Sequence, residues 1–175
     1  MKLKTRDIVY IGFIAALCAV ATTIRIEIPG GAMVHLGSAA LFTTSILFGG
    51  LYSGLGAAIG SALFDLFGGH TQYIVFSFFI KGIAGLIVGG MTAGYLPPSI
   101  NKPTASFSRI LVALIIGAIW TAFGYFIAWW FVLNSAAVAA SKIQYSLITS
   151  AAGIIVAIVL TPKLQKVVRR LFTKN

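Results

Sequence analysis

Residues 71–95, TQYIVFSFFIKGIAGLIVGGMTAGY, form an apolar run with one charged residue, Lys81. Such a run is long enough for the ~20 residues that an α-helix needs to cross the hydrocarbon core of a bilayer. Backbone N–H and C=O groups cannot bond to lipid, so a spanning segment must be a helix or part of a closed barrel. The alternation of apolar and polar residues typical of barrels is absent. The stretch therefore predicts a transmembrane helix.

The composition extends this prediction to the whole chain. Hydrophobic residues make up 59% of the sequence, charged residues 9%, and the mean hydropathy is +1.00. A soluble domain has about 25% charged residues. We expect a single domain over residues 1–175, an all-α integral membrane protein built as a six-helix bundle. The predicted spans cover residues 8–25, 36–52, 54–68, 71–95, 109–133 and 140–162.

The basic residues predict the topology. The net charge of +10 would favour nucleic acid as the partner of a soluble protein, but here most of the basic residues lie between or outside the apolar runs, so no nucleic acid is expected. Clusters of this kind mark the cytoplasmic side. Both termini are therefore predicted to be cytoplasmic, and the first apolar run is interpreted as a retained span. The basic residues assigned to that side are Lys2, Lys4, Arg6, Lys102, Arg109, Lys163, Lys166, Arg169, Arg170 and Lys174.

Two opposite charges, Asp65 and Lys81, lie inside the predicted third and fourth spans. Ionisable groups inside a membrane are costly, by about 3 to more than 10 kcal/mol at the bilayer centre, and are functional-site candidates by default. Two interpretations stand. The pair could form a buried salt bridge that fixes the register of two antiparallel helices, or one or both groups could contact a polar ligand.

The junction of the fifth and sixth spans adds aromatic and polar candidates. Trp129, Asn134, Lys142 and Tyr145 lie at the outer level, where the tryptophans could equally form an interfacial aromatic belt. Adjacent Trp129 and Trp130 point about 100° apart on a helix, so only one of them is expected to face the bundle interior squarely. Flat aromatic faces beside hydrogen-bonding groups suit a small planar heterocycle.

Three residues of the external connections, His35, His70 and Gln72, complete the candidate binding set. Neither histidine has a partner at metal-ligand spacing, so no metal site is predicted. The lone cysteine, Cys18, excludes a disulfide within the chain. No nucleotide-binding or catalytic motif is present, so neither an enzyme nor a cofactor is expected, and transport against a gradient would need an ion or a partner.

Small residues recur at helical spacing in the first span, as Gly12 with Ala16 and Ala15 with Ala19. Small residues four apart let two membrane helices approach closely. The spacing does not distinguish packing inside the bundle from docking of an external protein. The pairs Gly56 with Gly60 and Gly85 with Gly89 are interpreted as packing within the bundle.

Several stretches together resemble the substrate-binding S components of energy-coupling factor (ECF) vitamin transporters, over residues 10–95. The resemblance is closest to the branch of the proposed pyridoxine and hydroxymethylpyrimidine carriers. The matching stretches are AALCA (15–19), IEIPGGAMVHLGSAALFTTSILFGG (26–50), GAAIGSALFDLFGG (56–69) and QYIVFSFFIKGIAGLIVGGM (72–91).

The resemblance implies a prokaryotic plasma-membrane protein that binds a vitamin from outside, under a lid formed by the loop after the first helix. It then topples against a transmembrane coupling protein (EcfT-type), driven by two ATPase subunits. Ala15 and Ala19 match the family's docking motif, so the resemblance favours an external partner for the first helix. A B6 vitamer such as pyridoxine, or hydroxymethylpyrimidine, is the expected ligand, with riboflavin or folate as the alternative. A stand-alone secondary transporter, coupled to protons through Asp65 and Lys81, is the alternative of another class.

Overall fold

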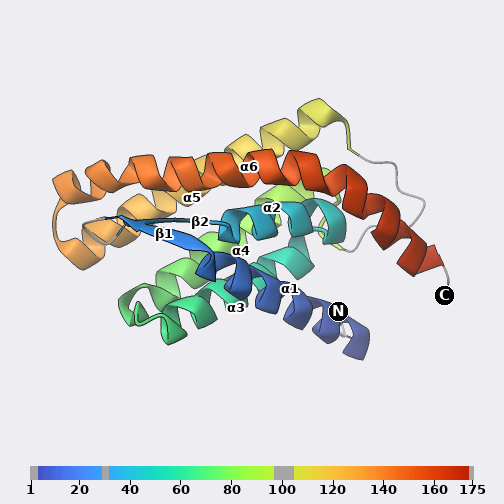
Figure 1. The fold of residues 1–175 in the computed structure, drawn as a ribbon, viewed down its shortest axis with the longest axis horizontal. Coiled ribbons are helices and arrows are strands. Elements are labelled where there is room, and N and C mark those ends of the chain that lie inside the picture. Colours follow the sequence, from blue (N-terminus) through green and yellow to red (C-terminus); the bar gives the residue numbers. More distant parts are fainter. Residues whose placement is uncertain (1–3, 29–31, 97–104, 174–175) are drawn as a thin grey trace.

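The computed structural model describes residues 4–28, 32–96 and 105–173. Long helices lie lengthwise beside one another around a short central helix, with a β-hairpin at one end of the bundle (Figure 1). The elements in chain order are α1 (Thr5–Thr23), β1 (Arg25–Ile28), β2 (Ala32–His35), α2 (Gly37–Phe48), α3 (Gly50–Phe67), the 3₁₀ turn η1 (Thr71–Tyr73), α4 (Ile74–Thr92), α5 (Phe107–Leu133) and α6 (Ala136–Thr173).

Five of the six predicted spans are confirmed as helical segments long and apolar enough to cross a membrane. Within the described residues these segments are Thr5–Thr23, Gly50–Phe67, Thr71–Thr92, Phe107–Leu133 and Ala136–Val168.

The predicted second span, 36–52, is too long, because α2 has only 12 residues and ends at Phe48. A helix of that length rises about 18 Å, well short of the bilayer core. The chain turns at Gly49, whose φ of 85° is unfavourable for any residue with a Cβ atom. A Cβ there would also lie 2.8 Å from the carbonyl oxygen of Gly94. Since residues 37–47 are all buried, α2 is an interior helix surrounded by the others.

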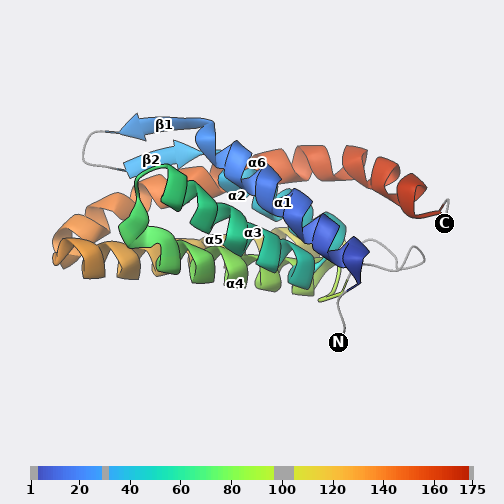
Figure 2. The same cartoon turned by 90° about the horizontal axis from the view of Figure 1, so that it is seen from below.

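The loop predicted between the first two spans is in part a β-hairpin. β1 and β2 pair antiparallel, with Arg25 opposite His35 and Ile28 opposite Ala32. Four-residue strands are too short to show a clear two-residue period in the sequence. The hairpin lies at the end of the bundle opposite the N- and C-termini and beside α6 (Figure 2), where the hydroxyl of Thr149 reaches the carbonyl of Met33 at 3.5 Å.

Rows of small residues hold α3 between α1 and α4. A Cβ atom on Gly85 would lie 2.7 Å from the Cα of Gly54, and one on Gly56 would lie 2.7 Å from the Cβ of Ile14. Such contacts let the helix backbones approach closely. Close packing of this kind stabilises helix association in lipid, where the hydrophobic effect does not contribute. The predicted glycine pairs therefore pack within the bundle, as expected.

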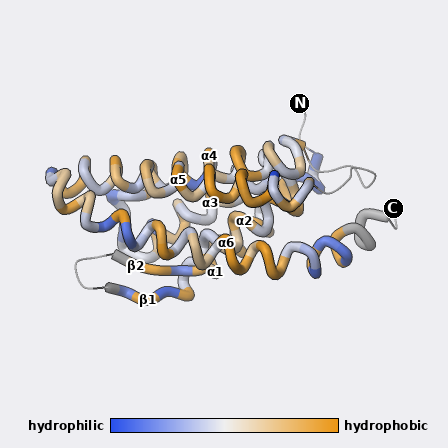
Figure 3. Tube along the Cα trace, turned by 90° about the horizontal axis from the view of Figure 1, so that it is seen from above, coloured by the Kyte–Doolittle hydropathy of each residue, from blue (hydrophilic) through white to orange (hydrophobic). Residues whose placement is uncertain are grey.

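The helix α6 continues past the predicted end of the sixth span at residue 162. Pro162 lies inside the helix, and α6 runs on to Thr173. A proline removes one backbone hydrogen bond and kinks a helix without having to end it, and Figure 1 shows the C-terminal part of α6 bending away. Hydrophobic residues dominate the middle of the bundle, while hydrophilic ones occur toward that end of α6 (Figure 3).

Candidate functional site

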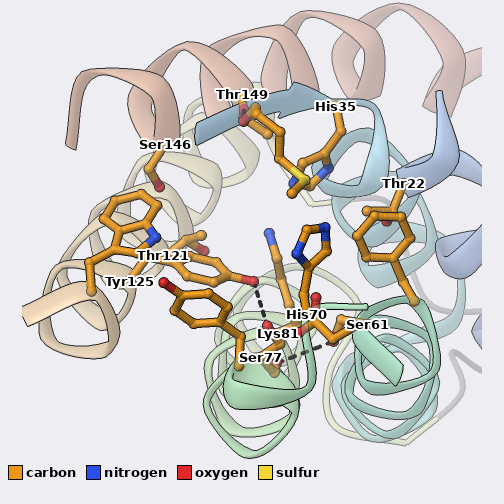
Figure 4. Close-up of a pocket in the computed structure, with 15 residues that line it drawn as sticks. Thr22, His35, Ser61, His70, Ser77, Lys81, Thr121, Tyr125, Ser146 and Thr149 are labelled. Carbon is orange, nitrogen blue, oxygen red and sulfur yellow. Dashed lines mark hydrogen bonds between the residues drawn. The ribbon is translucent and has the colours of Figure 1, made fainter. Parts of the chain in front are cut away.

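A cavity opens at the hairpin end of the bundle, enclosing about 750 Å³ of space including its open mouth. Hydroxyl, imidazole and aromatic side chains from separate elements point into it (Figure 4). The residues that line it are Thr22, Met33, His35, Ser61, Phe64, Asp65, His70, Tyr73, Ser77, Lys81, Thr121, Tyr125, Trp129, Ser146 and Thr149.

The two intramembrane charges, Asp65 and Lys81, both line this cavity and form no ion pair with each other. Asp65 is 7% exposed, and its Oδ2 atom has no hydrogen-bond partner. Lys81 is 5% exposed, and its Nζ donates a hydrogen bond to Ser38 Oγ at 3.0 Å. The register-fixing salt bridge is therefore not formed, and both charges are directed to the cavity instead.

An aromatic wall on α5 flanks Lys81. The Lys81 ammonium lies 5.5 Å from the centroid of the Tyr125 ring, and the Tyr125 and Trp129 rings lie 5.6 Å apart. The Tyr125 hydroxyl is hydrogen-bonded to Ser77 Oγ at 3.0 Å, which fixes the ring against α4. Trp130 is 52% exposed on the outer surface. As predicted, one of the two tryptophans faces the interior and the other faces outward.

The hairpin contributes His35 and Met33 to the cavity from β2. His35 Nδ1 accepts a hydrogen bond from the Gly37 N–H at 3.1 Å, so a neutral ring carries its proton on Nε2. Burial lowers the pKa of His35 from 6.5 to about 3, and the positive charges of Lys81 and Arg25 act in the same direction. The ring is therefore neutral near pH 7 and adds no charge to the cavity.

The turn between α3 and η1 forms the other side of the mouth. His70 Nε2 is buried and has no hydrogen-bond partner, and its ring lies 6.1 Å from that of Phe64. The guanidinium carbon of Arg25 lies 5.0 Å from the Phe64 ring centroid, so β1 contacts the end of α3 here. Arg25 also pairs with Glu27 at 2.7 Å. The hairpin is thereby held over the cavity mouth by a contact between side chains.

The structure brings together five of the nine predicted binding residues: His35, Asp65, His70, Lys81 and Trp129. The other four do not line the cavity. Gln72 and Asn134 are exposed, Lys142 is buried elsewhere on α6, and Tyr145 is half-buried. Lys142 lies one helical turn before the lining residue Ser146, whereas Tyr145 is rotated about 100° from Ser146.

Ten lining residues were not predicted from the sequence. Most are Ser, Thr or aromatic residues, which are common in membrane helices and stand out only when several converge in space. A helical spacing was the one signal that could have found Ser146 and Thr149, since they are three apart on one face of α6. The residues missed are Thr22, Met33, Ser61, Phe64, Tyr73, Ser77, Thr121, Tyr125, Ser146 and Thr149.

The small residues of α1 divide between two faces. Ala15 is 4% exposed. A Cβ atom on Gly60 would clash with the carbonyl oxygen of Ala15, so Ala15 packs directly against α3. Gly12 and Ala16 are exposed, and Ala19 is half-buried. A Cβ atom on Gly12 would meet nothing within 4 Å. Of the four residues predicted to dock a coupling protein, Ala15 therefore lies inside the bundle, and Gly12 and Ala16 lie on its surface.

Three comparisons with known proteins bear on this arrangement. Residues 2–166 match the family described as the S component of ECF-type riboflavin transporters. An uncharacterized protein from Pyrococcus woesei is 28% identical over 142 residues, which cover 81% of this chain and 88% of that protein. A solved structure described as the S component of a bacterial ECF transporter superposes with a TM-score of 0.66 at 20% identity, covering 94% of this chain and 98% of the other.

Proposed function

The chain belongs to the family of ECF-type riboflavin transporter S components, and from this premise we propose that it captures a small water-soluble vitamin in the cavity beneath the hairpin. The family consists of substrate-binding transport components and not of enzymes. The observation that carries the proposal is the cavity itself, where two buried charges and an aromatic pair converge. Polar groups that converge beside aromatic side chains in a cavity are typical of sites for small molecules.

Riboflavin is the first ligand to test, because the description of the matching family names it. A B6 vitamer such as pyridoxine, or hydroxymethylpyrimidine, is the second candidate, supported by the resemblance of residues 10–95 and by the single Tyr125–Trp129 pair, which suits one ring. Folate fits less well. Its two carboxylates would have to be neutralised by Lys81, the one basic side chain among the lining residues apart from the histidines.

The charges support a cytoplasmic position for both termini. Five of the described basic residues lie at the start of α1, the start of α5 and the C-terminal part of α6, away from the hairpin (Figure 1): Lys4, Arg6, Arg109, Lys163 and Lys166. Arg25, Lys81 and Lys142 lie elsewhere in the fold. With this end in the cytoplasm, by the positive-inside rule, the cavity opens outward. Vitamin then enters from outside under the hairpin.

Energy for uptake comes from partners in this proposal, since the sequence carries no nucleotide-binding motif. A transmembrane coupling protein (EcfT-type) and two ATPase subunits would bind the cytoplasmic half and drive toppling. The exposed Gly12 and Ala16 offer a surface of α1 on which another helix could pack closely.

The direct experiment is titration of the purified full chain with riboflavin, pyridoxine and hydroxymethylpyrimidine. Sub-micromolar binding of one of them supports the proposal, and no such binding of any of them overturns it. A stand-alone proton-coupled transporter, which the buried Asp65 and Lys81 would suit, predicts a different result. Vesicles containing this chain alone would then accumulate the vitamin when a pH gradient is imposed.

A further inference from the structure

We propose that the cavity selects its ligand through two separated poles, an acceptor pole at Asp65 and a donor pole at Lys81. The ligand class is then a planar heterocycle whose edge carries both a ring N–H and an exocyclic oxygen. This inference rests on the proposed function and deepens it, because it states which atoms of a vitamin the chain recognises.

The acceptor pole lies in the last turn of α3. Asp65 Oδ2 is buried without a hydrogen-bond partner, and the nearby His70 Nε2 is buried without one as well. The C-terminal turn of a helix carries partial negative charge, so α3 itself does not stabilise this carboxylate. A buried carboxylate oxygen requires a donor. An N–H on the ligand would supply it.

The donor pole lies where α4 meets the start of α2. The Lys81 ammonium has three N–H donors, and Ser38 accepts one of them. Ser38 belongs to the first turn of α2, and a helix N-terminus carries partial positive charge. Figure 4 shows Lys81 directed into the same space as His70. An oxygen of the ligand is the complementary group here.

The separation of the two poles is itself informative. Asp65 and Lys81 line one cavity from neighbouring helices, yet no ion pair of 4.0 Å or less joins them. Two charges in direct contact would neutralise each other, and a ligand that bound to them would then gain little binding energy. Because the two charges are separated, one neutral or zwitterionic ligand can donate a hydrogen bond to Asp65 and accept one from Lys81.

Both vitamin candidates carry such an edge. The flavin ring of riboflavin has an imide N–H between two carbonyl groups, and pyridoxine has a pyridinium N–H and a phenolate oxygen. A ligand with several negative charges does not fit, because the acceptor pole would repel it. The poles therefore define a class of ligand without depending on one vitamin.

The test uses the full chain in lipid nanodiscs with riboflavin and 3-methylriboflavin, in which a methyl group replaces the imide hydrogen. We expect wild type to bind riboflavin ~10–100-fold more tightly than the methylated compound, the range for a hydrogen bond to a charged group. In Asp65→Ala this preference should fall to about twofold or less, while Lys81→Met should weaken both compounds and keep the preference. Trp130→Phe, on the outer surface, is the matched control and should behave as wild type.

The outcomes separate the two proposals. Equal binding of the two flavins by wild type, or an unchanged preference in Asp65→Ala, overturns the two-pole inference and leaves vitamin capture standing. If wild type binds pyridoxine and not riboflavin, the same comparison is made with pyridoxine and its N1-methyl derivative, with the same criteria. If wild type binds none of riboflavin, pyridoxine and hydroxymethylpyrimidine, vitamin capture is overturned and the inference falls with it. The wild-type comparison of the two flavins needs no variant, so misfolding of a variant cannot conceal the answer.

Discussion

Asp65 on α3 and Lys81 on α4 face one cavity, are 7% and 5% exposed, and form no ion pair with each other. Burying a charge is costly, and a salt bridge between the two groups would have offset part of that cost. A fold that keeps two such groups apart therefore sacrifices stability at this position. We attribute this cost to ligand recognition.

Removing one of these charges should weaken binding without destabilising the empty protein. In Asp65→Asn we expect vitamin affinity to fall about tenfold, because a hydrogen bond to a carboxylate becomes a weaker one to a neutral amide oxygen. The apparent Tm of the ligand-free chain should stay the same or rise, since an unpaired buried charge is removed. Breaking a true buried salt bridge would instead cost about 3–5 kcal/mol. Thermal unfolding in detergent together with vitamin titration measures both effects, and a large fall in the Tm of the empty protein would support the structural role.

The two adjacent tryptophans provide a matched pair of variants. Trp129 lines the cavity beside Tyr125, whereas Trp130 is 52% exposed. Trp129→Ala should reduce vitamin affinity by about tenfold or more, because an aromatic contact contributes ~0.5–1.5 kcal/mol beyond its buried area. Trp130→Ala should change the affinity less than about twofold. Isothermal titration of both variants checks this, and equal losses would indicate that Trp129 acts through the fold and not through the ligand.

The two faces of α1 should respond differently to added bulk. Gly60→Val places a side chain where the Ala15 carbonyl lies, so we expect the chain to lose about 1–3 kcal/mol of stability, as in other overpacked cores. Gly12→Val meets nothing within 4 Å and should leave the isolated chain unchanged.

The exposed face of α1 can be tested through its effect on partner binding. If α1 docks on a coupling protein through Gly12 and Ala16, Gly12→Val should reduce co-purification with that protein and its ATPases while vitamin binding by the chain alone persists. Unchanged assembly of Gly12→Val would place the docking surface elsewhere on the molecule.

His35 should make the fold sensitive to acid. Its pKa is about 3 in the folded chain against the ordinary value of 6.5, because burial disfavours the charged ring. As the pH falls, His35 therefore becomes protonated in the unfolded chain at a higher pH than in the folded chain. The stability that neutral His35 contributes is complete above about pH 6.5 and is lost progressively between that pH and 3. The Tm of wild type should fall from pH 7.5 to pH 5 more steeply than that of His35→Gln, and parallel curves would exclude His35 as the cause.

The sequence predicted the parts of this fold that depend on length and composition. Long apolar runs identified five spanning segments, and the glycine pairs identified the close packing of α3. The boundary at Gly49 could not be placed, because several glycines in FGGLYSGLG permit a turn and only the contact with Gly94 selects one of them. The β-hairpin was missed because four-residue strands show too little periodicity.

The site was predictable only where the chemistry is conspicuous. Charges and histidines in an apolar sequence, such as Lys81 and His70, stand out and do line the cavity. Hydroxyl residues such as Ser77 and Thr121 do not, because Ser and Thr in membrane helices commonly bond to their own backbone, as Thr121 does to the Gly117 carbonyl. For Ala15, by contrast, the sequence signal was clear but ambiguous. Its spacing suits an external partner and an internal one equally, and only the position of Gly60 decides which face it occupies.

In the proposed function, the cavity beneath the hairpin holds a vitamin. Native mass spectrometry of the full chain, purified after expression with riboflavin and pyridoxine in the medium, tests it most directly. We predict a 1:1 complex with one of these vitamins in wild type and in Trp130→Phe, and its loss in the double variant Asp65→Ala, Lys81→Met. Ligand-free wild type would contradict the claim, as would a vitamin retained at equal occupancy when both charges are gone.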